Sequence, residues 1–549
     1  MTGAEVAVEA LRREGVTHVF GLPGTTIMHL LDALGRQPEV RYISVRHEQA
    51  AGFMADGFAR GSGRLAACLV SRGPGAANLA TAVHNAHAES IPVLVLVGQV
   101  ADAISHREAF EEMDLVGLFR PITRWAVEVH DAARIPELLQ RAVRTALAGR
   151  PGPVMVSLPL DVQQRTVVEP AFQACFRLQP PRPQPKELEA ASDLLASSER
   201  PLLLVGGGAA NEPSRQSVTA LAEAMEAPVA TTWTRNAAFP NRHRLYVGAL
   251  GYGVLPVTEE ALAEADVLIS LGCRFSEFTT RRWRAISGAT RLVQCDVDPE
   301  EIGRVYVPTV GLWGDAGATA RALAGMLAER GAPPGPRRRR AAALRERYRG
   351  QSALPADSRT ASGVPSRAVV EALRTVLAGR RVTLLNDAAS FGPWLHRYLE
   401  YERAGSFLGA AGGAMGWGLP AAMGVQLARP EERVLCVSGD GAFGMVAQEL
   451  ETAVRERIPV VTVVTNNRAF GNTRDRQRID HGGRYTGVFF DNPDLAAYAR
   501  LLGAHGERVE RADELLPAIE RSLESGLPAV VDVIQNRHEG LPPDLAPPR

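Results

Sequence analysis

The sequence has few of the features that mark zinc, disulfide-rich, nucleic-acid-binding or membrane proteins. Its five cysteines include no Cys-x-x-Cys pair, which argues against a zinc site or a disulfide framework and suits the reducing cytosol. Its 61 basic and 61 acidic residues cancel, so a polyanionic partner such as a nucleic acid is not indicated. The longest apolar runs, such as Ile91 to Val97, are too short to span a bilayer. The polar N-terminus, Met1 to Gly15, lacks the apolar core of a signal peptide, and we expect a cytoplasmic protein without a membrane partner.

Short apolar runs of strand type alternate with helix-like stretches through most of the chain, which predicts parallel sheets covered by helices. Two stretches break this alternation. Residues 170–186 are rich in proline, and residues 330–365 contain a second proline cluster followed by the run Arg337 to Arg340. An arginine run can bind nucleic acid, but in a chain of zero net charge we interpret it as a solvated linker.

The two breaks divide the chain into three α/β units of similar size. We predict an α/β fold of three consecutive doubly wound parallel-sheet domains. Their expected bounds are 1–168, 186–330 and 366–536, with a linker over 331–365.

The run Gly439-Asp440-Gly441 follows a short apolar stretch, Arg433 to Ser438, that is typical of a buried strand. Glycine has no Cβ, so the backbone of such a turn can pass close to a ligand. A helix predicted over Ala442 to Arg455 would present its N-terminal amides to the same turn. Taken alone, a Gly-Asp-Gly run is most often an ordinary turn.

A second strand, predicted over Pro459 to Thr465, leads into Asn466 and Asn467. Two neighbouring strand ends would therefore offer a carboxylate, from Asp440, and an amide oxygen. A hard cation such as Mg²⁺ prefers oxygen ligands and completes its shell from phosphate and water. The combination favours a site for a metal-bound diphosphate.

Glu48 stands among small and apolar residues in the run Arg46-His47-Glu48-Gln49-Ala50-Ala51. A carboxyl group in such surroundings is partly desolvated, which favours sharing a proton with a ligand. A glutamate in the first turn of a helix can equally serve the backbone amides there. The residues alone leave both interpretations open.

The Gly-Asp-Gly run and the Asn-Asn pair, at their observed spacing, resemble the signature of thiamine-diphosphate (ThDP) enzymes. The resemblance covers the chain from about residue 3 to about residue 535. It implies that Mg²⁺ is bound by Asp440, by the Asn467 side chain and by the backbone carbonyl of Ala469. It also implies that the cofactor is bound by residues on both sides of the metal, namely Gly439, Asp440, Gly441, Ala442, Asn467, Ala469 and Gly471.

The same resemblance assigns Glu48 the catalytic role of promoting the cofactor's imino tautomer by a hydrogen bond to its aminopyrimidine ring. In the glycine-rich stretch Gly412 to Ala422, it implies that Gly413 and Met415 hold the pyrimidine, with Met415 as a wedge beneath the cofactor. The alternative for Met415 is a core residue. Because Glu48 and Met415 lie on different domains, and active sites of this family lie between subunits, we expect a homodimer or a dimer of dimers.

Within this superfamily the chain is most similar in character to the large subunit of acetolactate synthase. The segments that carry this likeness are Gly73 to Asn78, Gly149 to Val154 and Asp296 to Arg304. The likeness implies decarboxylation of a 2-oxo acid, with pyruvate expected, and transfer of the acyl carbanion to a second carbonyl acceptor. The expected substrate pocket contains Pro23, Gly24, Phe110 and Glu111.

Several positions depart from the synthase pattern, including Glu111 in place of glutamine and Leu160 in place of lysine. Ser406-Phe407 with Ala410 to Gly413 instead resembles benzoylformate decarboxylase. A non-ligating 2-oxo acid decarboxylase or carbon–carbon lyase therefore remains the alternative. A flavin-using oxidase and a catalytically silent subunit are further hypotheses, and the intact Glu48 and Asp440 argue against the last.

A three-glycine run beginning at Gly206 follows a predicted strand in the middle domain, which alone is a weak phosphate signal. Together with other positions it resembles the FAD cradle of acetolactate synthases, although relatives without flavin keep a similar domain. FAD is therefore a possible second cofactor. The residues expected to contact it are Gly206, Gly207, Thr231, Leu250, Gly251, Gly272, Arg274, Asp296 and Asp298.

Overall fold

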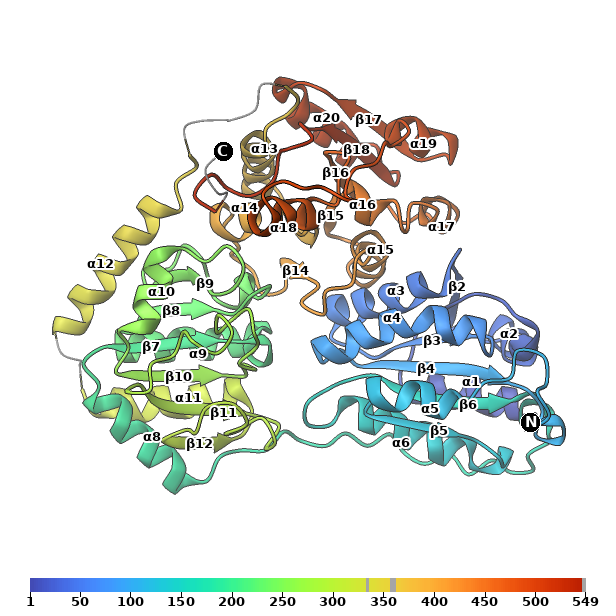
Figure 1. Cartoon of the computed structure of the whole chain (residues 1–549). Helices are drawn as coiled ribbons and strands as arrows, with labels where there is room; N and C mark the ends of the chain where they lie inside the picture. Colours follow the sequence, from blue (N-terminus) through green and yellow to red (C-terminus); the bar gives the residue numbers. More distant parts are fainter. Residues whose placement is uncertain (332–334, 356–361, 546–549) are drawn as a thin grey trace.

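The computed structural model describes residues 1–331, 335–355 and 362–545. It contains three α/β domains, each with a six-stranded sheet in which the paired strands are parallel. Figure 1 shows the N-terminal domain in blue, the central domain in green to yellow and the C-terminal domain in orange to red. The predicted fold class is confirmed. Within the described ranges, no helix combines the length and the apolar character that a membrane crossing requires.

The N-terminal sheet has the strand order β2-β1-β3-β4-β6-β5. Its strands are β1 (His18–Gly21), β2 (Arg41–Ser44), β3 (Ala66–Val70), β4 (Val93–Gln99), β5 (Trp125–Glu128) and β6 (Val154–Pro159). Its helices are α1 (Gly3–Arg13), α2 (Met28–Gly35), α3 (Glu48–Ser62), α4 (Pro74–Glu89), α5 (Leu115–Phe119), α6 (Ile135–Leu147) and α7 (Leu160–Gln164). Every residue of β3, β4 and β6 is buried, because helices cover both faces of the sheet.

The C-terminal sheet has the order β14-β13-β15-β16-β18-β17, which matches the N-terminal order position by position. Its strands are β13 (Val382–Asp387), β14 (Phe407–Gly409), β15 (Arg433–Gly439), β16 (Val461–Asn466), β17 (His505–Val509) and β18 (Ala529–Ile534). Its helices are α13 (Ser366–Gly379), α14 (Gly392–Tyr398), α15 (Gly418–Ala428), α16 (Asp440–Phe443), α17 (Glu449–Arg455), α18 (Gly471–His481), α19 (Leu495–Leu501) and α20 (Ala512–Glu524).

The prediction of one continuous helix from Ala442 to Arg455 is wrong. Two short helices, α16 and α17, are separated by turns over residues 444–448. The chain leaves α16 at Gly444, and glycine is a poor helix former.

The central sheet has a different order, β12-β11-β10-β7-β8-β9. Its strands are β7 (Pro201–Val205), β8 (Val229–Thr231), β9 (Tyr246–Ala249), β10 (Val267–Leu271), β11 (Arg291–Asp296) and β12 (Val310–Trp313). Its helices are α8 (Pro185–Ser197), α9 (Glu212–Met225), α10 (Pro256–Ala263), α11 (Ala316–Glu329) and α12 (Gly335–Gln351). The order reverses between β7 and β10, as in doubly wound nucleotide-binding sheets.

Helix α12 occupies much of the stretch that the sequence suggests is a solvated linker. Arg337 is buried and donates to the backbone carbonyl of Ser198, and Arg345 donates to that of Tyr246. These contacts hold α12 against the central domain, so this part of the stretch is helical and packed. The prolines Pro333 and Pro334 lie outside the described residues, and the domain bounds stay predictions.

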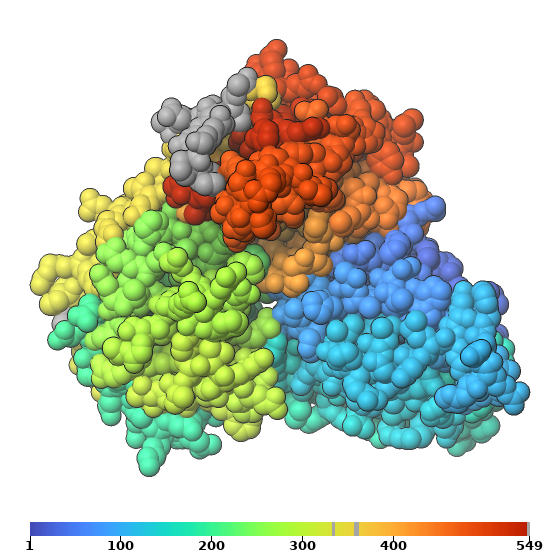
Figure 2. All heavy atoms as spheres, in the orientation of Figure 1, coloured from blue at the N-terminus to red at the C-terminus, as the bar shows by residue number. Residues whose placement is uncertain are grey.

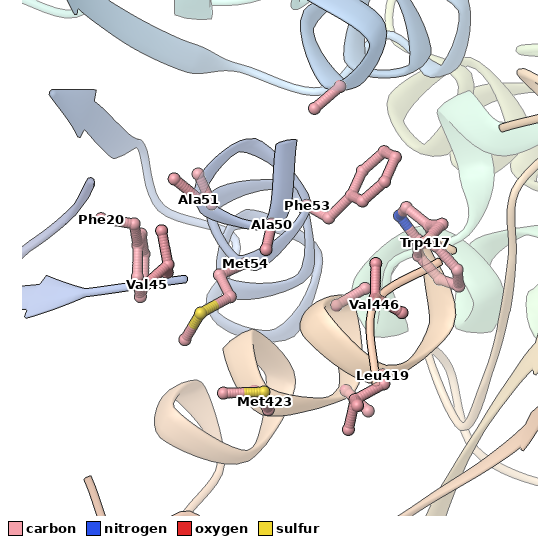
Figure 3. Packing of buried hydrophobic residues seen from close by; sticks show 14 of the residues in the cluster. Phe20, Val45, Ala50, Ala51, Phe53, Met54, Trp417, Leu419, Met423 and Val446 are labelled. Carbon is pink, nitrogen blue, oxygen red and sulfur yellow. The ribbon is translucent and has the colours of Figure 1, made fainter. Parts of the chain in front are cut away.

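The N- and C-terminal domains share one hydrophobic core, in which α3 packs directly on α15. Figure 3 shows Phe53 beside Trp417, and Met54 of α3 facing Met423 of α15. The two helices approach so closely that a Cβ added to Gly57 would lie 2.0 Å from the carbonyl oxygen of Ala421. In the space-filling view the three domains meet side by side at the centre of the molecule (Figure 2).

Candidate functional site

The Gly-Asp-Gly run lies at the carboxyl end of β15, beside the point where the strand order of the C-terminal sheet reverses. Asp440 is buried and its two carboxylate oxygens accept three hydrogen bonds. Oδ2 accepts from the backbone N–H of Arg468 at 2.7 Å and from Asn492 Nδ2 at 2.8 Å, and Oδ1 accepts from Gly441 N at 3.0 Å. Burial raises the pKa of Asp440 to about 6, against the opposing effect of these hydrogen bonds.

Asn467 lies immediately after β16, at the neighbouring strand end. Its Nδ2 donates to the backbone carbonyl of Glu539 at 3.0 Å. Its Oδ1 is buried and accepts no hydrogen bond from any residue that the structure describes. A buried oxygen without a partner is costly to the fold, so it suits a group that binds a cation.

Ala469 pairs with Phe489 in an isolated antiparallel bridge. The two hydrogen bonds of that bridge are made by the residues on either side of Ala469. Neither of these bonds uses the Ala469 carbonyl. The donor set of Asp440, Asn467 and Ala469 therefore consists of oxygens, as Mg²⁺ prefers, and the residues fit this ion.

Two glycines beside the metal candidates are fixed by close packing. A Cβ added to Gly441 would lie 2.8 Å from the ring of Phe470, and one added to Gly471 would lie 2.4 Å from Ser390 Oγ. Gly439 ends β15, and the buried Ala442 is in α16. These positions place backbone amides around Asp440, where a diphosphate could accept hydrogen bonds.

Asn492 is a site residue that the sequence analysis misses. Its Nδ2 donates to both Asp440 Oδ2 and Asn466 Oδ1, at 2.8 and 2.9 Å. It lies in a loop that follows α18, and no local motif marks it. Only the folded chain brings it to the ends of β15 and β16.

The glycine-rich stretch forms a loop between β14 and α15. Gly413 and Gly416 both have φ of +81°, a backbone region that favours glycine. The Met415 side chain is 40% exposed, so it is not part of the core of this chain. Asp387, at the end of β13, accepts from Gly418 N at 2.9 Å, and burial raises its pKa to about 7.

Glu48 is the first residue of α3 and is buried at the carboxyl edge of the N-terminal sheet. Its Oε2 accepts from Asn78 Nδ2 of α4 at 2.9 Å. The helix start is capped by His47, whose side chain accepts from Gln49 N. Among the hydrogen bonds of the described residues, none joins Glu48 to a backbone amide, which is what the helix-start interpretation would require.

The four residues expected in the substrate pocket gather around the segment after β3. A Cβ on Gly24 would lie 2.5 Å from Ser71 Cβ, and Pro23 precedes Gly24 after β1. Arg72 Nε donates to the Phe110 carbonyl at 2.8 Å, and the guanidinium of Arg72 lies 3.4 Å from the Glu111 carboxylate. The Phe110 side chain is 77% exposed.

The two halves of the expected site lie on different domains of the chain. In the parts of the chain that the structure describes, no hydrogen bond or ion pair joins Glu48 to Asp440, Asn467 or Met415. The metal candidates lie on the C-terminal sheet and Glu48 on the N-terminal one.

The residues expected to contact FAD lie at one edge of the central sheet. They follow or end the strands β7, β8, β9, β10 and β11 at their carboxyl ends, where doubly wound sheets bind ligands. A Cβ on Gly206 would lie 2.2 Å from the carbonyl oxygen of Gly272, so the backbone is tightly packed at the point of strand reversal. Burial raises the pKa of Asp296 to about 6.

Most of the positions expected to contact FAD fit a nucleotide, but the side chain of one of them already makes a hydrogen bond within the protein. Arg274 is partly buried, and its guanidinium donates to the backbone carbonyl of Ala88 in the N-terminal domain. Gly251, with φ of +120°, packs on the side chain of Trp233. The cradle is therefore formed by backbone and carboxylates more than by free cationic side chains.

Comparison with known proteins gives matches to three family models. Residues 1–118 match the N-terminal TPP binding domain of thiamine pyrophosphate enzymes, residues 188–323 the central domain and residues 387–533 the C-terminal TPP binding domain. A probable acetolactate synthase large subunit of Methanocaldococcus jannaschii is 33% identical, over 100% of this chain and 94% of the relative. The acetolactate synthase isozyme 2 large subunit of Escherichia coli is 33% identical over 100% and 98%, and the large subunit of Parasynechococcus marenigrum 34% over 100% and 90%.

Proposed function

Because the chain belongs to the family of thiamine pyrophosphate enzymes, we propose that it is a carboligase dependent on ThDP and Mg²⁺. It decarboxylates a 2-oxo acid, with pyruvate as donor, and transfers the acyl carbanion to a second carbonyl compound. The relatives, acetolactate synthase large subunits matched over nearly their full length, support this reaction over the non-ligating alternative. The observation that carries most weight is the buried, unpartnered Oδ1 of Asn467 at the strand end next to Asp440.

In this proposal Asp440, Asn467 Oδ1 and the Ala469 carbonyl hold Mg²⁺, which binds the diphosphate of the cofactor. The backbone around Gly439, Gly441, Ala442 and Gly471 accommodates the phosphate oxygens. Asn492 keeps the Asp440 carboxylate oriented by its hydrogen bond to Oδ2. Metal binding also keeps that carboxylate ionised, although burial in the apoprotein raises its pKa.

When bound, ThDP would supply the nucleophilic carbanion and the electron acceptor that decarboxylation of a 2-oxo acid requires. Glu48 would share a proton with the aminopyrimidine ring, and Asn78 fixes the position of its carboxyl group through the bond to Oε2. Gly413 and Met415 would support the pyrimidine from the other domain. Pro23, Gly24, Phe110 and Glu111 line the approach of the substrates.

The active site is completed by a second copy of the chain, in a homodimer or a dimer of dimers. One observation supports this arrangement: the Met415 side chain is 40% exposed within the single chain. It would be covered if the loop that carries it faced Glu48 of the partner.

For the central domain we propose an FAD site at the carboxyl edge of its sheet, with the flavin in a structural role. The cluster of glycines and carboxylates at five strand ends supports it. The test is the visible absorption of the purified protein, followed by anaerobic addition of pyruvate. A bound flavin that pyruvate does not reduce agrees with a structural role, whereas reduction would indicate an oxidase.

The reaction itself is tested by incubating the purified protein with ThDP and Mg²⁺ and then with pyruvate or with benzoylformate. The expected product from pyruvate is a 2-hydroxy ketone of acyloin type, together with carbon dioxide. Release of aldehyde without any ligated product, from either donor, would contradict the carboligase and favour the non-ligating decarboxylase.

A further inference from the structure

The loop that carries Gly413 and Met415 is held by a carboxylate from another domain. Glu89, the last residue of α4, is buried, and its Oε1 accepts from the backbone N–H of Gly412 at 3.0 Å and from that of Ala411. These two amides immediately precede Gly413. A Cβ added to Gly412 would lie 2.4 Å from Asn85 Oδ1, so α4 also packs directly against the loop.

Glu89 is in turn held by two arginines. Its Oε2 lies 3.5 Å from the guanidinium of Arg60 on α3, and it accepts a shorter bond from Arg235 of the central domain. Arg60 Nε also donates to Asp56 Oδ1 at 2.6 Å, and Asp56 Oδ1 accepts from the indole N–H of Trp417 at 3.0 Å. All three domains therefore contribute to one buried polar network around Glu89.

The charge state of Glu89 follows from this network. Burial alone would raise its pKa, but the attraction of Arg235 and Arg60 outweighs burial and the pKa is lowered. The group that holds the loop is therefore a carboxylate, and hydrogen bonds to an ionised acceptor are the stronger kind.

Arg235 also lies next to the expected nucleotide site. A Cβ added to Gly207 would lie 3.2 Å from Arg235 Nε. The same guanidinium thus lies beside the turn after β7 in the central domain and donates to the carboxylate that holds the loop after β14. In the described parts of the chain, none of the residues expected to contact FAD makes a hydrogen bond to that loop, so Arg235, which neighbours them, provides the link through Glu89.

We propose that Glu89 is a positioning residue that sets the Met415 loop for the cofactor and links that loop to the central domain through Arg235. The inference rests on the proposed function, because it assigns the loop to the pyrimidine side of ThDP. Glu89 reaches no reacting atom. It fixes two backbone amides next to a glycine with positive φ, where a small displacement would move Met415 relative to the bound cofactor.

The test compares Glu89→Gln with wild type and with the matched variant Glu226→Gln. Glu226 is also a buried carboxylate held by two arginines, Arg244 and Arg338, but it lies within the central domain away from the loop. The measurements are ThDP affinity by calorimetry in the presence of Mg²⁺, the circular-dichroism signal of the bound cofactor's imino tautomer, kcat at saturating ThDP, and the thermal midpoint.

In Glu89→Gln we expect weaker ThDP binding, a smaller imino signal and a kcat about 10- to 100-fold lower, since misplacement by an ångström can cost this much. Glu226→Gln should lose thermal stability to a similar extent and keep the imino signal and kcat. If Glu89→Gln does not fold, Glu89→Asp keeps the charge between the arginines but withdraws it from the amides, and the same losses are expected.

Wild-type affinity, imino signal and kcat in a folded Glu89 variant would overturn the inference. So would losses that only match those of Glu226→Gln at equal thermal stability. Calorimetry on the wild type is done first: absence of ThDP binding there contradicts the proposed function itself, whereas normal binding in the wild type with an unaffected Glu89 variant contradicts only the role of Glu89.

Discussion

Asn78 Nδ2 donates to Glu48 Oε2 at 2.9 Å, and this bond ties α4 to the first residue of α3. The other carboxylate oxygen, Oε1, lies beside Gly75, where an added Cβ would approach it to 3.2 Å. The Glu48 carboxyl group is thus held from one side by an amide and from another by the tightly packed start of α4. The position of this carboxyl group therefore depends on Asn78. In the sequence, Asn78 is marked only by belonging to the segment Gly73 to Asn78, which resembles acetolactate synthase.

Replacing Asn78 by alanine is expected to lower kcat about 10- to 100-fold, the equivalent of the about 1.5–3 kcal/mol carried by a hydrogen bond to a charged group. ThDP affinity should change less than kcat, because the diphosphate is held elsewhere. Steady-state kinetics at saturating ThDP checks this. Gln140→Ala on α6, which removes a side-chain bond to the Ala174 carbonyl, is the control and should keep its activity. An unchanged kcat in Asn78→Ala would mean that Glu48 needs no support from α4.

Replacing Asn467 by alanine should separate cofactor binding from stability. The free energy of unfolding of the apoprotein is expected to change by less than about 1 kcal/mol, because removal of the unpartnered Oδ1 offsets the lost bond from Nδ2. Mg²⁺-dependent ThDP affinity should fall at least 10-fold. Calorimetry with and without Mg²⁺, together with urea unfolding, measures both quantities, and ThDP affinity equal to wild type would exclude Asn467 as a metal ligand.

Chelation is expected to have the same effect as mutation of the metal ligands. Treatment with EDTA should abolish ThDP binding, and added Mg²⁺ should restore it in wild type but not in Asp440→Ala. ThDP binding that persists in EDTA would contradict a metal-bound diphosphate. Asp480→Ala, on the exposed end of α18, is the matched control and should respond to Mg²⁺ as wild type does.

We expect the stability of the protein to depend on pH because of Glu449 on α17. Its carboxylate accepts from Arg46 N at 3.1 Å and from Thr452 Oγ1 at 2.8 Å, and burial raises its pKa from 4.5 to about 7. Since the native state binds this proton more tightly than the unfolded chain, stability is lost as pH rises from about 4.5 to about 7. Ionisation of Glu449 lowers the free energy of unfolding by at most roughly 3 kcal/mol.

The measurement is urea unfolding of the apoprotein at pH 5 and pH 8, for wild type and for Glu449→Gln. Glutamine resembles the protonated acid, so the variant should lose less stability than wild type over this interval. Asp387, whose pKa burial also raises to about 7, contributes equally to both proteins and cancels in the comparison. An identical pH dependence in the two proteins would show that Glu449 is ionised in the native state.

The contact between α3 and α15 predicts which glycines tolerate a side chain. Gly57→Val is expected to destabilise the protein by about 3 kcal/mol, because a Cβ would lie 2.0 Å from the Ala421 carbonyl oxygen and backbone cannot move aside cheaply. Gly325→Ala in α11, where nothing lies within 4 Å of the added Cβ, should instead stabilise by up to about 1 kcal/mol. Thermal unfolding distinguishes the two variants. A wild-type thermal midpoint in Gly57→Val would mean that the N- and C-terminal domains can move apart at the α3–α15 contact at little cost.

The sequence predicts the sheets and the two strand ends because parallel strands give continuous apolar runs followed by polar residues. Asp440 and Asn467 follow such runs, and their placement at neighbouring strands needs only the β-α-β alternation. Their metal-binding role and that of Glu48 stay predictions. Asn492 and Glu89 could not be identified in this way, because each reaches its partner only through contacts between distant segments.

Helix α12 shows a second limit. The run Arg337 to Arg340 is polar and indicates solvated chain. Ala341, Leu344 and Tyr348, however, recur three and four residues apart on one face of the helix and are buried in the core of the central domain. In the structure Arg337 and Arg345 are buried because backbone carbonyls of Ser198 and Tyr246 accept their hydrogen bonds. Hydropathy cannot anticipate such acceptors, since they belong to the ends of other elements.

The most direct measurement is a crystal structure of the protein grown with ThDP and Mg²⁺. We predict the metal between Asp440 and Asn467, with the diphosphate beside it and Met415 beneath the cofactor. We also predict the aminopyrimidine within hydrogen-bond distance of Glu48 of the partner subunit. An empty crevice at Asp440 under saturating cofactor, or a cofactor that contacts neither Asp440 nor a Glu48 carboxylate, would contradict this prediction.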